Sequence, residues 1–236
     1  MTTIPAKPLG IKAYGSIGHM AGSRMGPGDH RVPDGQAAIA TIKARDRHDR
    51  VIVTEKLDGS CTAVARINGE LVALGRAGWP AQSSPYEQHQ LFAVWVRANV
   101  ARFDDLVDGE RMVGEWLAQA HGTRYQLDHE PWVPFDVMVL TRRKPWDVTL
   151  ERIQRAGLRP PALISYGPPI SIETAIALLG DNGFHGALDP VEGAVWRVER
   201  RGEYDFMAKY VRPDKIDGAY LPDISGQPAI WHWRPS

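Results

Sequence analysis

The 236-residue chain is 43% hydrophobic and 24% charged, a balance that is typical of a folded, soluble protein and excludes an intrinsically disordered one. Its 28 basic and 28 acidic residues give zero formal net charge, which disfavours a strongly basic duplex binder but leaves room for a local basic patch. It has no apolar run of transmembrane length, no secretory signal and a single cysteine, so we expect a cytoplasmic protein without a membrane partner.

The N-terminal part of the chain shows no sustained period. Residues 9–36 are rich in glycine, proline and aspartate, which predicts loops with short strands. The segment AAIATIKARDR, residues 37–47, is compatible with a short helix. We therefore expect residues 1–50 to form a loop-rich leader.

A strong strand signal begins at residue 51. VIVTEKL, CTAVARI and ELVALGR are rich in valine, isoleucine and threonine, and Asn68-Gly69 between the last two is a favoured hairpin turn. The same composition recurs in four later segments. These further predicted strands span residues 112–118, 133–139, 193–200 and 204–211.

Three helices are predicted between and after the first strands. The sequence Ser84-Pro85-Tyr86-Glu87 resembles a capping box and would open a helix over 85–103. A second helix is predicted over 147–157, closed by its final glycine, and a third over 171–180 with Ser171 as its cap.

The predicted elements together indicate an α+β fold of antiparallel sheets with flanking helices. No linker divides the chain, so we expect one domain over residues 1–236. Residues 212–236 are too rich in proline and glycine to form a domain, and we expect this C-terminal tail to cross the surface.

Lys56 ends an apolar strand and is followed by Leu57-Asp58-Gly59. By itself Lys-x-Asp-Gly is a weak motif, and a solvated lysine before a turn explains it equally well. The motif becomes specific in combination with several polar and aromatic positions that follow it in a defined order. These are Arg76 in ALGRAG, Glu115 in MVGEWL, Phe135-Asp136 in VPFDVMV, Glu192-Gly193 in EGAVWR and Lys209 in DFMAKYV.

This ordered set resembles the covalent nucleotidyltransferase superfamily of RNA ligases, DNA ligases and mRNA-capping enzymes, and most closely the small bacterial and phage RNA ligases. The resemblance covers about residues 50–215. It implies an ATP-grasp-like adenylation domain that uses ATP and Mg²⁺ or Mn²⁺. It also implies ligation of RNA 5′-phosphate and 3′-hydroxyl ends through a lysyl-AMP intermediate, and it leaves open a protein partner for strand binding.

The resemblance also assigns roles to individual residues. Lys56 would be the nucleophile, which requires neighbouring cations or desolvation to lower its pKa. Glu192 would bind the metal, since Mg²⁺ prefers carboxylate oxygens. The alternative for each position is an ordinary structural residue, for instance a core phenylalanine or a surface arginine. The nucleotide-binding residues would be Glu55, Asp58, Gly59, Arg76, Glu115, Phe135 and Lys209.

One position departs from the family pattern. The family's last motif carries Lys-x-Lys, and if Lys209 is the second lysine, Met207 occupies the place of the first. Arg212 or Lys215 is expected to supply the missing charge.

Three hypotheses follow. The first is an ATP-dependent RNA ligase. The second is a DNA ligase or a GTP-using capping enzyme, which is disfavoured because little chain follows Lys209 for the OB-fold module that such enzymes usually carry. The third is a non-catalytic relative that binds nucleotides or RNA, for which Met207 is the hint.

Overall fold

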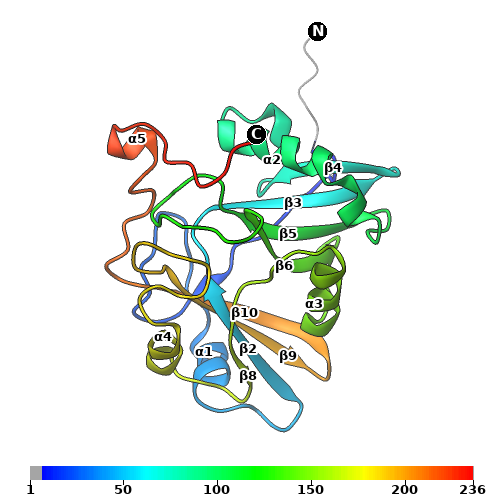
Figure 1. Cartoon of the computed structure of the whole chain (residues 1–236). Coiled ribbons are helices and arrows are strands. Elements are labelled where there is room, and N and C mark those ends of the chain that lie inside the picture. Colours follow the sequence, from blue (N-terminus) through cyan, green and yellow to red (C-terminus); the bar gives the residue numbers. More distant parts are fainter. Residues whose placement is uncertain (1–6, 236) are drawn as a thin grey trace.

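Two five-stranded sheets form the body of the protein (Figure 1). The structure is a computed structural model and describes residues 7–235. Sheet A has the strand order β1 (Gly18–His19), β10 (Glu203–Val211), β9 (Gly193–Arg200), β2 (Asp49–Lys56), β8 (Leu163–Gly167). Sheet B has the order β4 (Glu70–Gly75), β3 (Ser60–Ile67), β5 (Glu110–Trp116), β6 (Trp132–Val139), β7 (Arg142–Arg143).

The predicted α+β class is confirmed, with one exception to its antiparallel pairing. All seven predicted strands are present, and Asn68 and Gly69 both have positive φ, as the hairpin turn requires. The exception is β1, which pairs in parallel with β10 and aligns His19 with Lys209. The leader thereby adds the edge strand of sheet A.

Three of the four longer helices lie on the outer faces of the sheets, and the fourth lies at one side, between the two sheets (Figure 1). α1 (Asp34–Thr41) and α4 (Ile172–Leu179) pack on sheet A, whereas α2 (Glu87–Ala98) packs on sheet B. α3 (Trp146–Arg155) contacts β6. Three short helical turns complete the structure: η1 (Ala81–Ser83), η2 (Val100–Phe103) and α5 (Pro222–Ser225). Within residues 7–235, no helix combines the length and apolar character needed to cross a bilayer.

Two of the predicted helix boundaries are wrong. The capping box does not form, because Ser84 Oγ accepts from the Tyr86 amide and bonds to His89, and α2 starts only at Glu87. The first helix lies at Asp34–Thr41 instead of 37–47. It ends early because the charged segment that follows is held outside the helix, where Asp46 and Asp49 form ion pairs with Arg200.

The other two helix predictions are confirmed, but one strand was missed. Ser171 Oγ accepts from the Thr174 amide at 3.1 Å and caps α4, and Gly157 follows α3 with positive φ. Strand β8 escaped prediction because LISYG is short and flanked by prolines, and pairing with β2 holds it in the sheet.

Alternation along the strands of sheet A separates a core face from a polar face. Val51 and Val53 of β2, with Trp196 and Val198 of β9, pack into a buried cluster that includes residues of α1 and α4. The intervening residues point to the opposite side of the sheet. That second face, which carries Lys56, is turned toward sheet B.

Candidate active site

A cavity of about 290 Å³ is lined by residues of both sheets. The link from β2 to β3 crosses from sheet A to sheet B at this point, so the Lys56-Leu57-Asp58-Gly59 motif lies where the chain changes sheets. The structure brings all nine predicted site residues to the cavity wall. They are Glu55, Lys56, Asp58, Gly59, Arg76, Glu115, Phe135, Glu192 and Lys209.

Lys56 is held by an ion pair inside the cavity. Its Nζ lies 2.6 Å from Glu192 Oε2, and the side chain is 20% exposed. Burial would lower the pKa of Lys56, but the carboxylates of Glu192 and Glu115 outweigh burial, and the pKa is raised. The lowered pKa expected for a nucleophile is therefore not found, because neighbouring anions hold the proton on the amine.

Glu115 is positioned by the motif itself. The Gly59 amide donates to Glu115 Oε1 at 3.1 Å, and a Cβ at position 59 would approach the Trp116 carbonyl oxygen to 2.5 Å. Only glycine therefore fits beside β5 here. Burial raises the pKa of Glu115 to about 8, although the charge of Lys56 opposes this.

Asp58 turns toward the neighbouring loops. Its Oδ2 accepts from the Gly122 amide at 2.9 Å and lies 3.0 Å from Lys215 Nζ, and its own amide donates to the Tyr125 hydroxyl. Lys215 also donates to the Gly122 carbonyl at 2.7 Å. Asp58 thus joins the strand crossing to the 122–125 turn and to the C-terminal tail.

The expectation that Arg212 or Lys215 replaces the missing lysine is wrong. Lys215 is committed to Asp58, and Arg212 pairs with Asp214 and Asp181. Neither side chain lines the cavity, whereas Met207 does. The Met207 sulfur accepts a weak hydrogen bond from the Tyr14 hydroxyl at 3.6 Å, so this place in the wall is apolar.

Lys209 lies against the leader. Asp29 Oδ1 is 3.9 Å from Lys209 Nζ, and Asp29 Oδ2 is 3.1 Å from the buried His19 Nε2. Burial and the nearby charge of Lys56 lower the pKa of Lys209. Lys56 and Lys209 therefore share the cavity as two cations with opposite pKa shifts.

Phe135 and Arg76 occupy the sheet B side. The β5–β6 register shifts at Val113/Gly114, which pairs Gly114 with Pro134 and leaves Phe135 as the extra residue of a bulge. The Phe135 ring meets the Tyr14 ring edge-on at 5.3 Å. Arg76 is exposed at the end of β4, and one of its amino groups lies 3.5 Å from the Gly15 carbonyl.

Glu55 reaches the cavity wall differently from the other eight residues. It is paired with Ala194, on the core face of sheet A, and its Oε2 accepts from the Phe184 amide at 3.0 Å. Its carboxylate therefore lies on the other side of the sheet from Lys56. A nucleotide-binding role for Glu55 stays a prediction. Since the carboxylate faces away, only the main chain of Glu55 could make the contact.

Glu55 should make stability depend on pH. Burial raises its pKa to about 7 from 4.5, partly offset by the Phe184 amide. The folded protein thus binds the proton more tightly than the unfolded chain, so this contribution is complete below pH 4.5 and lost as pH rises through 7. The shift corresponds to roughly 3 kcal/mol.

Urea unfolding at pH 5 and pH 8 will test this effect in the wild type and in Glu55→Gln, which keeps an acceptor for Phe184. We expect the wild type to lose roughly 3 kcal/mol more than the variant between the two pH values. Parallel pH profiles would contradict the assignment.

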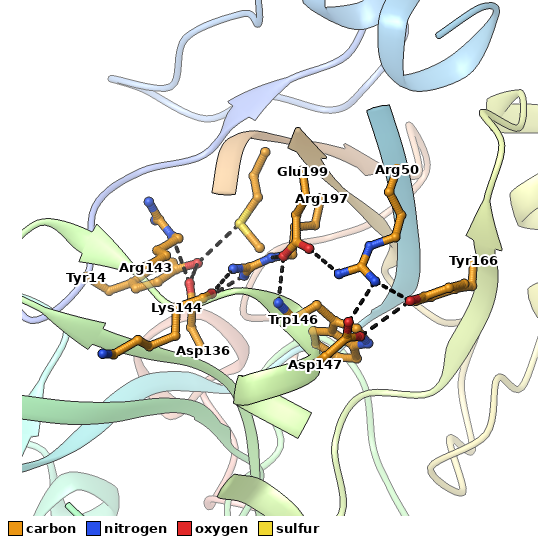
Figure 2. A network of polar contacts seen from close by, with 11 residues as sticks. Tyr14, Arg50, Asp136, Arg143, Lys144, Trp146, Asp147, Tyr166, Arg197 and Glu199 are labelled. Carbon is orange, nitrogen blue, oxygen red and sulfur yellow. Dashed lines mark hydrogen bonds and ion pairs between the residues drawn. The ribbon is translucent and has the colours of Figure 1, made fainter. Parts of the chain in front are cut away.

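A buried ionic network joins the two sheets next to the cavity (Figure 2). Asp136 of β6 accepts from Tyr14, from Arg143 at 2.7 Å and from Arg197 at 3.1 Å. Arg197 also bonds to Glu199 at 2.8 Å. Because Asp136 belongs to sheet B and Arg197 to sheet A, the network fixes the distance between the two sheets.

The network extends from Glu199 to β2, β8 and α3. Arg50 pairs with Glu199 and with Asp147 of α3, and it also bonds to the Tyr166 hydroxyl (Figure 2). Residues 142–144 form a basic segment, Arg-Arg-Lys. Its central residue, Arg143, belongs to the network through its ion pair with Asp136.

Twelve of the cavity-lining residues were not proposed as site residues, and Tyr14, Cys61, Arg197 and Met207 are among them. For Arg197 a usable signal exists, because it lies two residues after Val195 on the same strand face as the cavity. For Tyr14 none exists, because it belongs to a segment without periodicity.

The acidic residues of the cavity fit a metal that binds together with a nucleotide. Among residues 7–235, no three His, Cys, Asp or Glu side chains gather as a ready-made metal site. Mg²⁺ commonly takes only one or two carboxylates and completes its shell with substrate phosphates and water. Glu192, 8% exposed and beside Lys56, has the chemistry for that role.

The family model for RNA ligase matches residues 49–211, which is more than half of the chain. The chain belongs to the RNA ligase family. The matched region runs from the start of β2 to the end of β10 and contains all nine predicted site residues. A comparison with curated protein sequences found no match.

Solved RNA ligases share the fold. The Naegleria gruberi RNA ligase with PPi matches with a TM-score of 0.56 at 16% identity, over 89% of this chain and 62% of that chain. A variant of that ligase with AMP and Mn gives a TM-score of 0.53 at 13% identity, over 85% and 60%. An archaeal ATP-dependent RNA ligase gives 0.44 at 21% identity, over 69% and 42%, a score too low to carry an argument.

The chain is shorter than these relatives. It spans between 50% and 62% of the Naegleria ligase chains that it matches. At such low identity the likeness establishes the RNA ligase fold and nothing finer.

Proposed function

We propose that this member of the RNA ligase family is an ATP-dependent RNA ligase that joins 5′-phosphate and 3′-hydroxyl ends through a lysyl-AMP intermediate. One observation carries the proposal: Lys56 and Glu192 form a 2.6 Å ion pair in a cavity lined by all nine predicted site residues. The Naegleria structures, described with ATP and Mn, with AMP and Mn or with PPi, support ATP and a divalent metal as cofactors.

In the first step the Lys56 amine attacks the α-phosphorus of ATP. A nitrogen–phosphorus bond forms, the bond from the α-phosphorus to the bridging oxygen breaks, and pyrophosphate leaves. The amine must first lose its proton, which the charges of Glu192 and Glu115 hold in place. Lys56 therefore becomes nucleophilic only when the negative charge of these carboxylates is engaged elsewhere.

Glu192 is the residue that would exchange partners. As a ligand of Mg²⁺, it would no longer stabilise the Lys56 ammonium, and the pKa of Lys56 would fall. The bound cation would supply positive charge beside the triphosphate. Lys209, with its pKa already lowered by burial, would place its charge near the α-phosphate, and Phe135 would stack on adenine.

The transfer of AMP to RNA and the sealing of the two strands take place in the same cavity. An oxygen of the RNA 5′-phosphate attacks the adenylate phosphorus, and the Lys56–phosphorus bond breaks as Lys56 takes up a proton. The 3′-hydroxyl oxygen of the second strand then attacks the RNA phosphorus as its proton passes to water, the bond from this phosphorus to the oxygen that bridges it to AMP breaks, and AMP departs to leave a phosphodiester. Arg76, exposed at the end of β4, has donors for a phosphate of the incoming strand.

Transfer of radioactive label tests the proposal. The protein should become labelled by α-³²P-ATP with Mg²⁺, should not be labelled by α-³²P-GTP, and should pass the label to 5′-phosphorylated RNA. Labelling by GTP would indicate a capping-type enzyme, and transfer to DNA ends alone would indicate a DNA ligase.

Nucleotide binding without a covalent adduct would favour the non-catalytic relative, for which the apolar Met207 wall is the structural argument. The single-domain organisation, the cytoplasmic location and a protein partner for strand binding stay predictions from the sequence.

A further inference from the structure

A second hollow, of about 690 Å³, lies next to the candidate active site. The segment that connects β4 to α2 forms most of it, with Trp79, Tyr86 and His89 on its walls. We call it the Trp79–Tyr86 groove. No step of the proposed adenylation uses it.

The groove is continuous with the cavity that contains Lys56. Cys61 and Arg76 line both hollows, so a molecule bound in the groove lies beside the reacting groups. Arg76 stands at the junction and is exposed. A strand end that reaches Lys56 from this side passes Arg76 first.

Two large aromatic side chains are left open in the groove. Trp79 is 41% exposed and Tyr86 is 56% exposed, whereas Trp95, Trp116 and Trp132 are almost completely buried. Burying Trp79 in the core would be favourable. Its exposure beside a reaction cavity indicates a surface that meets a ligand.

The aromatic walls are held in place before any ligand arrives. The Trp79 carbonyl accepts from the Gly75 amide at 2.9 Å, and Gly78, with φ of +90°, is packed so closely on the Ile11 carbonyl that no side chain fits there. On the other wall, the Tyr86 ring meets the His89 ring edge-on at 5.7 Å. Rigid aromatic faces bind a flat ligand at a low cost in conformational entropy.

The charge at the groove favours an anionic ligand. None of the described residues that line it is acidic, and Arg76 is among them. Lys7 adds a second cation, with its Nζ 5.3 Å from the centre of the Trp79 ring. Flat aromatic faces beside cations match the alternation of base and phosphate in a single nucleic-acid strand.

We infer that the Trp79–Tyr86 groove binds the terminal nucleotides of the 5′-phosphorylated RNA strand, with a base stacked on the aromatic side chains and a phosphate at Arg76. The inference rests on the proposed function, which it deepens by placing the strand that receives AMP. A protein segment would be the other occupant of an apolar groove, and the experiment below separates the two.

The test compares binding and transfer in Trp79→Ala and Tyr86→Ala. Fluorescence anisotropy with a labelled 5′-phosphorylated single-stranded RNA should show Kd about tenfold higher in each variant, because one stacking surface is lost. Transfer of AMP from the labelled protein to this RNA should fall at subsaturating RNA, while labelling by ATP persists. Gln82→Ala, at an exposed position of η1 outside the groove, is the matched control and should behave like the wild type.

An RNA with abasic terminal nucleotides makes the test specific for stacking. It should bind the wild type more weakly than intact RNA, and this loss should be about tenfold smaller in Trp79→Ala, where only Tyr86 remains to stack. Equal losses in the wild type and in Trp79→Ala, or an unchanged Kd in both aromatic variants, would overturn the inference and favour a protein segment as the occupant. Because anisotropy needs no catalysis, failure of ATP labelling would refute the proposed function and leave this readout intact.

Discussion

Lys56→Arg should abolish covalent labelling by ATP while the fold remains intact. An arginine keeps a positive charge opposite Glu192, so the buried carboxylate at 2.6 Å is not left unpaired. A guanidinium does not lose its proton near neutral pH and cannot attack phosphorus. We expect label incorporation to fall by at least about 10³-fold, since the nucleophile itself is removed.

Denaturing gel electrophoresis after incubation with α-³²P-ATP and Mg²⁺ measures this loss. Lys43→Arg is the matched control, because Lys43 is an exposed lysine outside the cavity. Circular dichroism should show the same fold for all three proteins. A Lys56→Arg protein that still accepts label would identify another residue as the nucleophile.

Lys215→Met should destabilise the protein by about 3 kcal/mol. The side chains of Lys215 and Asp58 are only 6% and 13% exposed, and removing one partner of a buried pair leaves an uncompensated charge. For a chain of this length the change corresponds to a fall in Tm of about 6 to 12 °C. The strand crossing that carries Lys56 should loosen as well, because Asp58 belongs to it.

Arg212→Met provides the comparison in the same tail. Its partners Asp214 and Asp181 are 67% and 85% exposed, so we expect a loss of less than about 1 kcal/mol. Calorimetry of both variants checks the contrast. Equal changes in Tm would show that the Lys215–Asp58 contact does not anchor the tail to the motif.

The sequence predicted the parts of the site that lie on regular strands. Lys56, Glu115 and Lys209 belong to segments whose composition marks them as strands, and the ordered motifs placed them in one cavity. Strand alternation also defines which neighbours share their face. The same rule places the Glu55 carboxylate on the face of sheet A opposite to Lys56. Motif matching alone does not distinguish the two faces.

Features that depend on contacts distant in sequence were not predictable. The edge strand at His19 forms because β10 offers a free edge, and nothing in residues 9–36 encodes that partner. The capping box failed because Ser84 Oγ bonds to His89 in the fold, which local propensity does not reveal. Lys215 similarly looked available for phosphate until the structure paired it with Asp58.

The parallel pairing of Gly18–His19 with Ala208–Lys209 has a consequence for biosynthesis. Gly18–His19 has no partner strand until the chain has been synthesised as far as β10. Contacts of such long sequence separation form slowly, because closing the intervening loop has an entropic cost. The cavity wall around Lys209 therefore forms only after β10 has been translated, and a nascent chain arrested before β10 cannot possess the complete cavity.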